Sequence, residues 1–245
     1  MNPEKPAPGP VEPLLELRKV TKVYGTGAAA VHALRGIDLR INRGEFVAVM
    51  GASGSGKSTC MGILGCLDTP TAGRYLFRGV DVGSLSRDQR ALLRRHFLGF
   101  IFQGYNLLNR TSALENVELP LMYRGVPPGQ RRERALAALE AVGLLGRETH
   151  TPAALSRGQQ QRVAIARAIV GNPQVLRADE PTGNLESAHS HDIMRLLTRF
   201  NQEQNITVLM VTHESDMAAY AGRVIHFVDG LVQADAAESR GAPVV

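Results

Sequence analysis

The chain has 245 residues, of which 44% are hydrophobic, and it carries a formal net charge of +5 at pH 7. This length and composition suit one large α/β domain or two small ones with a buried core. No apolar run approaches the roughly 18 residues of a membrane span, and no secretory signal opens the chain, so any spanning part is expected on another chain. The positive charge comes mostly from arginine and has no nucleic-acid-reading motif beside it, so nucleic acid is not an expected partner.

The first fifth of the chain divides into a leader and three strands. Residues 1–13 contain five prolines and no hydrophobic periodicity, which predicts a disordered leader. Residues 14–23, 31–41 and 45–50 have the apolar patterns of strands. Tyr24 follows the first of these strands; its ring has the shape to stack on a purine, but sequence alone favours an ordinary turn tyrosine.

A glycine-rich segment follows the third strand. Residues 51–59 read GASGSGKST and match the phosphate-binding pattern GxxxxGK[ST]. A helix is predicted over residues 59–67, so backbone N–H groups and a helix N-terminus converge on the place where phosphates would lie. Lys57 is then positioned to reach the β- and γ-phosphates, and the Ser58 hydroxyl to ligate Mg²⁺. The segment predicted to bind a nucleotide consists of Gly51, Ala52, Ser53, Gly54, Ser55, Gly56, Lys57, Ser58 and Thr59.

Two cysteines, Cys60 and Cys66, fall within this predicted helix and are the only ones in the sequence. Their spacing matches neither a zinc site nor a redox motif. They are expected to be small apolar residues in a reducing compartment.

A helical region interrupts the strand pattern in the middle of the chain. An arginine-rich helix precedes a short buried strand at residues 98–102, which delivers Gln103 to its end. Helical periodicity dominates residues 106–151 and is broken by a Pro-Pro-Gly sequence at residues 127–129. We therefore predict a helical subdomain inserted between two strands of the α/β core, over about residues 90–165 with the motif that follows it.

Polar residues follow two further strands. Residues 175–180 form an apolar run that ends in two adjacent carboxylates, Asp179 and Glu180. In a protein with this phosphate loop, such an aspartate faces Mg²⁺ through water, and the glutamate can polarise an attacking water. Residues 206–211 form another run, and His213 follows it. A lone histidine is usually structural, but open α/β sheets bind ligands at the carboxyl ends of their strands, which favours a place near the γ-phosphate.

The remaining elements complete a single domain predicted over residues 14–233. Residues 187–201 are typical of a helix. Residues 224–228 and 231–232 are expected to form a hairpin around an Asp-Gly turn. Residues 234–245 are expected to be a tail.

Together these motifs resemble those of the ATP-binding subunits of ABC transporters over roughly residues 14–232. The segment LSRGQ at residues 155–159 resembles the family signature LSGGQ. Stretches such as STCMGILGCLDTPTAGRY, FIFQGYNLL and ADEPTGNLES are similar to the macrolide-efflux and lipoprotein-release group of that family. The resemblance implies an α/β P-loop NTPase fold with a mostly parallel core sheet, an N-terminal antiparallel β subdomain and the inserted helical subdomain.

The resemblance also implies a role for individual residues. Tyr24 would stack on adenine, Glu180 would be the catalytic base, and His213 would be the switch histidine. Mg²⁺ would be held by Ser58, Gln103 and Asp179, and Gln103 would also report to the membrane partner. The signature that contacts the γ-phosphate of the other protomer's ATP would be Ser156, Arg157, Gly158 and Gln159, and communication across the dimer would involve Asn184, Leu185 and Glu186.

Three residues depart from the family pattern. Arg157 occupies the place of the first signature glycine, and Glu186 replaces an aspartate. Arg177 replaces an apolar residue in the strand before Asp179. Burying an unpaired guanidinium is very unfavourable, so Arg177 is expected to find a partner or to reach an edge of the sheet.

The implied function is that of an ATP-binding and ATP-hydrolysing subunit, with ATP and Mg²⁺ as cofactors. It would power export or extraction of a drug, peptide or lipoprotein through a separate integral membrane permease. The implied partners are a second copy in a head-to-tail dimer or a paired ATPase subunit, the permease, and optionally a periplasmic adaptor. The expected location is the cytoplasmic face of the inner membrane, as a peripheral protein.

Three alternatives stay open at this point. The first is a regulatory ABC ATPase of a membrane complex that controls cell-wall remodelling. The second is a catalytically weakened subunit of a heterodimeric transporter, suggested by Arg157 and Arg177. The third is a soluble ABC ATPase acting on DNA or ribosomes, against which the lack of a second ATPase domain or a long coiled-coil insertion argues.

Overall fold

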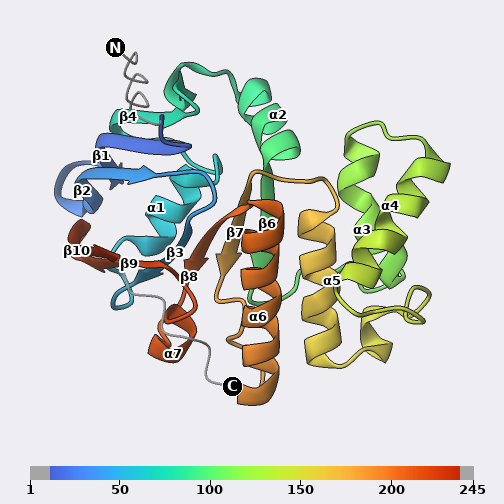
Figure 1. Ribbon diagram of the computed structural model, residues 1–245. Helices are drawn as coiled ribbons and strands as arrows, with labels where there is room; N and C mark the ends of the chain where they lie inside the picture. Colours follow the sequence, from blue (N-terminus) through green and yellow to red (C-terminus); the bar gives the residue numbers. More distant parts are fainter. Residues whose placement is uncertain (1–11, 238–245) are drawn as a thin grey trace, which may run out of the picture.

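The computed structural model describes residues 12–237 (Figure 1). The predicted leader lies outside these residues except for residues 12 and 13, and so does the end of the predicted tail.

Two β-sheets form the centre of the fold. The larger consists of β10 (Leu231–Ala237), β9 (Arg223–Val228), β3 (Phe46–Met50), β8 (Thr207–Val211), β7 (Val175–Asp179) and β6 (Leu98–Phe102), in that order across the sheet. The smaller consists of β2 (Val31–Ile41), β1 (Leu15–Tyr24), β4 (Ala72–Phe77) and β5 (Val80–Asp81). Neighbouring strands of the larger sheet are parallel except at the β9–β10 hairpin, whereas the smaller sheet is antiparallel. The predicted fold class is therefore confirmed.

Helices surround the larger sheet. They include α1 (Lys57–Leu64), α2 (Arg87–Phe97), α3 (Ala113–Tyr123), α4 (Pro128–Ala141), α5 (Arg157–Ile169), α6 (Ser187–Gln204) and α7 (Ser215–Ala218). In Figure 1, α3 and α4 lie together beyond α5, on the side opposite the smaller sheet. They are inserted in the chain between β6 and β7, where a helical subdomain is predicted. No helix within residues 12–237 is long and apolar enough to cross a bilayer.

Each face of the larger sheet has its own hydrophobic core, because side chains alternate along a strand. In β7, Leu176 and Ala178 belong to a core shared with α5, α6 and the helical insertion. Val175 belongs to a second core, shared with α1 and the smaller sheet. By the same alternation, Arg177 and Asp179 lie on the α1 face of the sheet.

Helix α1 differs from its predicted limits. Helix α1 begins at Lys57 rather than at residue 59 and ends at Leu64, so Cys66 lies beyond the helix with φ 54°. The prediction that both cysteines belong to the helix was therefore wrong for Cys66, although both are buried. Helix α5 begins at Arg157, because Ser156 forms a capping box with Gln159.

The last strand is longer than predicted. β10 runs to Ala237 and so enters the segment from residue 234 onward that was expected to be a tail. Asp235 holds this extension in place, since its carboxylate accepts hydrogen bonds of 2.6 and 2.7 Å from Arg223. Residues 234–237 are mostly small, so their sequence pattern did not predict that they pair with β9.

Candidate nucleotide-binding site

The loop between β3 and α1 owes its shape to glycine. Gly51 has φ 143° and Gly56 has φ 101°, which are conformations that other residues rarely adopt. A Cβ atom at Gly51 would overlap the carbonyl oxygen of Phe227, so the backbone approaches β9 closely. No side chain caps the N-terminus of α1. Its first N–H groups therefore face the loop, where an anion can accept their hydrogen bonds.

Lys57 folds back over this loop. Its Nζ donates hydrogen bonds to the carbonyl oxygens of Gly51 (2.7 Å) and Ala52 (2.6 Å). Burial lowers the pKa of Lys57, while the negative charge of Glu180 acts in the opposite direction. The ammonium group thus lies inside the curve of the loop, where it can exchange carbonyl oxygens for phosphate oxygens.

Asp179 ends β7 on the α1 face of the sheet, in register with Val211 of β8. Its side chain is 35% exposed, and its Oδ2 accepts a hydrogen bond of 3.1 Å from Arg177. No group of three His, Cys, Asp or Glu side chains suited to a metal occurs in residues 12–237. The Asp179 carboxylate and the exposed Ser58 hydroxyl fit Mg²⁺, which keeps several waters and shares phosphate oxygens.

Glu180 and His213 form a pair beyond the strand ends. Glu180 adopts a left-handed backbone conformation with φ 45°, and its N–H donates to the carbonyl of Val211 at 3.0 Å. Its Oε1 lies 3.2 Å from Nδ1 of His213. The Glu180 side chain is 30% exposed, so this carboxylate is held by an imidazole yet open to water. This arrangement suits a general base.

Gln103 and Asn184 connect two loops at the same edge. The Asn184 side-chain amide donates to the carbonyl oxygen of Gln103 at 2.8 Å. Leu185 packs against the core next to it. Glu186 is exposed and occupies the N-cap of α6, with no hydrogen bond from its side chain to the cap.

The segment of residues 156–159 lies apart from the groups described above. Ser156 and Gln159 bond to each other in the capping box, with the Ser156 N–H donating to Gln159 Oε1 at 3.0 Å. Arg157 is exposed in the first turn of α5, and Gly158 lies beside the His189 ring. Within residues 12–237, no hydrogen bond or ion pair joins this segment to the phosphate loop.

Tyr24 has partners that sequence reasoning missed. Its hydroxyl donates to Asp68 at 2.7 Å, and Lys22 donates to the other oxygen of Asp68 at 2.6 Å. The Lys22 ammonium also lies 4.9 Å from the centre of the Tyr24 ring. Because Asp68 is far from both residues in sequence, no local pattern pointed to it. The ring is 43% exposed and is held in place beside the end of α1.

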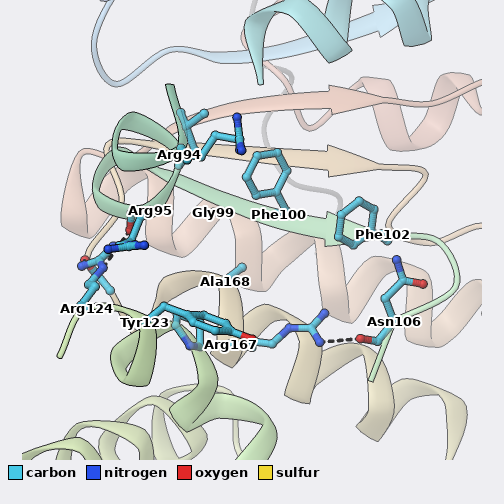
Figure 2. A pocket seen from close by; sticks show the side chains of 14 residues that line it. Arg94, Arg95, Gly99, Phe100, Phe102, Asn106, Tyr123, Arg124, Arg167 and Ala168 are labelled. Carbon is cyan, nitrogen blue, oxygen red and sulfur yellow. Dashed lines mark hydrogen bonds between the residues drawn. The ribbon is translucent and has the colours of Figure 1, made fainter. Parts of the chain in front are cut away.

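A groove lies between α2, β6, α3 and α5 (Figure 2). Its volume is about 550 Å³. Its lining includes four arginines (Arg94, Arg95, Arg124 and Arg167) and three aromatic residues (Phe100, Phe102 and Tyr123), but no Asp or Glu. Figure 2 shows Arg167 directed at Asn106, whose carbonyl oxygen accepts a hydrogen bond of 2.6 Å. Since Phe102 ends β6, the groove borders Gln103.

The fold brings most of the predicted residues to one edge of the larger sheet. The phosphate loop, Asp179, Glu180 and His213 follow neighbouring parallel strands there, and Gln103 follows β6. The signature segment is the exception. A site built from these residues alone lacks the contacts that the signature would supply.

Residues 34–183 match a protein family described as ABC transporter. The macrolide export ATP-binding/permease protein MacB of Marinobacter nauticus is 52% identical over 95% of this chain and 36% of its own length. The pyoverdine export ATP-binding/permease protein PvdT of Pseudomonas syringae pv. tomato is 50% identical over 94% of this chain and 35% of its own length. The chain thus spans about a third of the length of these relatives.

Solved structures agree with these sequence matches. A dimeric post-hydrolysis state of the ATP-binding cassette MJ0796, bound to ADP and Pi, has a TM-score of 0.84 at 43% identity and covers 91% of this chain and 98% of that chain. CbiO1 from Clostridium perfringens, part of the transporter complex cbiONQ, has a TM-score of 0.84 at 31% identity and covers 92% of this chain and 89% of that chain.

Proposed function

This chain belongs to the ABC transporter family, and from that membership we propose that it binds and hydrolyses ATP to power export through a membrane permease. The observation that carries the proposal is the meeting of the phosphate loop with Asp179 and the Glu180–His213 pair at one sheet edge. The loop offers backbone donors to phosphate, and the pair offers a base beyond it.

In this proposal each residue of the edge has a distinct task. Lys57 releases the carbonyl oxygens of the loop and binds phosphate. Ser58, Gln103 and Asp179 would hold Mg²⁺, which would supply positive charge beside the transferred phosphoryl group. Glu180 orients a water and accepts its proton, while His213 keeps the carboxylate directed at the reacting centre. Tyr24 stacks on the adenine.

The proposed working unit is a head-to-tail dimer. Residues 156–159 make no bond to the phosphate loop of their own chain within the described residues, which supports a role in trans on the partner's ATP. Asn184 would link the two sites, because its side chain already bonds to the Gln103 carbonyl.

The groove of Figure 2 is the proposed docking place of the permease. The exposed Tyr123, the half-buried Phe100 and Phe102, and arginines without a carboxylate among them suit a cytoplasmic segment that combines apolar and acidic side chains. The groove borders Gln103, so docking and nucleotide state would be connected. A permease partner would hold the chain at the cytoplasmic face of the inner membrane, and a periplasmic adaptor would act through the permease.

The test is Glu180→Gln, with Glu203→Gln as a control at an exposed position on α6. We expect Glu180→Gln to bind ATP, to lose turnover and to accumulate as an ATP-dependent dimer in light scattering. The control should hydrolyse ATP like wild type. A hydrolytically active, monomeric Glu180→Gln protein would contradict the proposal.

The weakened-subunit alternative rests on Arg157 at the exposed start of α5. It is tested by comparing the ATPase rates and dimer masses of wild type and Arg157→Gly. Similar turnover in both indicates an ordinary motor subunit. An inactive wild type that Arg157→Gly rescues indicates a subunit that needs a different, active partner.

A further inference from the structure

Arg177 is a charged residue in an apolar place. Its side chain is 9% exposed. It lies in register between Phe100 of β6 and Leu209 of β8. Above it, Gly65 follows the last residue of α1, and a Cβ atom there would lie 3.4 Å from the Arg177 Cδ. The Arg177 side chain therefore lies between the sheet and the end of α1, on the face of the sheet that carries the second hydrophobic core.

Asp179 is the group that offsets this charge. The Arg177 Nη2 donates to Asp179 Oδ2 at 3.1 Å, whereas the buried Nε has no acceptor among residues 12–237. Burial lowers the pKa of Arg177, and the charge of Asp179 acts against that change. A buried guanidinium with one such bond depends strongly on its single carboxylate.

The same carboxylate has a second task, because Asp179 is the metal-side aspartate of the proposed function. We propose that Arg177 is a positioning residue that shares Asp179 with the bound divalent cation and weakens the site's hold on that cation. The inference rests on the proposed function.

Two effects of Arg177 on the cation oppose each other. Its hydrogen bond fixes one oxygen of Asp179 and leaves Oδ1 free, which favours an ordered site. Its charge repels a cation bound to the same carboxylate. The repulsion is the larger effect, because the cation carries two charges and Arg177 is screened poorly by solvent.

The test compares wild type with Arg177→Met, Arg177→Gln and Arg177→Lys. Met removes the charge and the hydrogen bond, Gln removes the charge but can still donate to Asp179, and Lys keeps the charge. For each protein, the dissociation constant of a non-hydrolysable ATP analogue is measured by calorimetry in Mg²⁺ and in EDTA. The constant in EDTA divided by the constant in Mg²⁺ gives a ratio that reports the contribution of the cation alone.

We expect the ratio to be roughly tenfold higher in the Met and Gln variants, because the dissociation constant in Mg²⁺ falls while the constant in EDTA does not change. The ratio of the Lys variant should stay near that of wild type. Mn²⁺ added in place of Mg²⁺ should give a correspondingly larger bound fraction in paramagnetic resonance spectra. Thermal unfolding of each variant checks the fold. If the Met or Gln variant does not fold, the Lys variant still tests the inference, because a large rise in its ratio would contradict the charge effect.

An unchanged or lower ratio in Met and Gln overturns the inference. A wild-type ratio in Gln with a lower one in Met would assign the effect to orientation instead of charge, which also overturns it. If wild type binds no ATP analogue in either condition, the proposed function is wrong, and this inference is then wrong too. Binding with an unaffected ratio contradicts the inference alone.

Discussion

The hydroxyl of Tyr24 donates a hydrogen bond to the carboxylate of Asp68 across 2.7 Å. Asp68 also accepts from Lys22, whose ammonium lies against the Tyr24 ring. The ring proposed to stack on adenine is therefore oriented by a residue at the far end of α1. The phosphate loop precedes α1, and the carboxylate that holds the Tyr24 hydroxyl lies in the segment that follows the same helix.

Replacing Asp68 by alanine should weaken ATP binding by roughly threefold, since the Tyr24 ring loses its orientation and base stacking is worth about 1–3 kcal/mol. Tyr24→Ala should have the larger effect. Inorganic tripolyphosphate serves as the control ligand, because it has no base. Calorimetry should show equal tripolyphosphate affinity in wild type and Asp68→Ala; an equal loss for both ligands would mean that Asp68 supports the phosphate loop and not the base.

Ser156→Ala should reduce both stability and ATP turnover. The Ser156 hydroxyl accepts the Gln159 N–H at 3.3 Å, and losing such an N-cap costs about 1 kcal/mol. Ser112→Ala is the matched control, because Ser112 makes the same capping box with Glu115 at the start of α3. Chemical denaturation should show similar losses in both variants, whereas turnover should fall only in Ser156→Ala. Equal turnover in the two would remove Ser156 from the proposed trans site.

The two cysteines should be unreactive in the folded protein. Burial raises the pKa of the Cys60 thiol to about 12 and that of the Cys66 thiol to about 11. Because both folded pKa values exceed the ordinary value of 9.0, the thiols contribute stability below pH 9, and this is lost as the pH rises toward 11 and 12. Cys66→Ala should lose less stability than wild type over that alkaline range.

Reaction with a thiol-specific chromogenic disulfide at pH 8 provides the direct measurement. We expect no fast colour release from native protein and reaction of both thiols in denaturant. Rapid modification of one thiol in the native state would show that the segment around it opens readily, contrary to the burial of Cys60 and Cys66.

Arg124 should hold the helical insertion against the core. Its Nε donates to the Arg95 carbonyl at 2.8 Å, and its Nη1 donates to the Gly171 carbonyl, so it joins the end of α3 to α2 and α5. Arg124→Met should speed hydrogen exchange in α3, at residues 95–97 and at residue 171 by roughly tenfold or more, since a charged hydrogen bond is worth about 1.5–3 kcal/mol. ATP-analogue affinity should not change.

Arg131→Met is the control for that experiment. Arg131 pairs with Glu118 at 3.6 Å, a contact that stays within the insertion. Its loss should leave exchange at residues 95–97 and 171 unaffected. If both variants change exchange alike, the insertion is held by packing and not by Arg124.

The sequence predicted the elements whose cause is local. The run before Gly51 and the glycine pattern after it placed β3, the loop and the start of α1 nearly correctly, because each depends on neighbouring residues. The division into a mostly parallel core sheet and an antiparallel N-terminal subdomain followed from a family resemblance, and the order of the strands was not predicted. The left-handed conformation of Glu180 was not predicted, since glutamate does not usually adopt it.

Contacts between segments that are distant in the chain could not be predicted from the sequence. Asp68 showed no signal of its contact with Tyr24, and the partner of Arg177 became evident only once β7 had a defined face. The roles of Gln103 and the signature segment stay predictions, because they depend on a nucleotide and a second chain.

The alternation of β7 has a consequence for how this chain can change over evolutionary time. Asp179 lies on the α1 face of the sheet because it is four positions, an even number, after Val175, which faces the same core. Substitutions along β7 alter one side chain each. A single-residue insertion or deletion would instead exchange the two faces, turning the carboxylate toward the opposite core and Ala178 or its neighbour toward the nucleotide. The strand can therefore tolerate replacement, as Arg177 illustrates, but not a change of length.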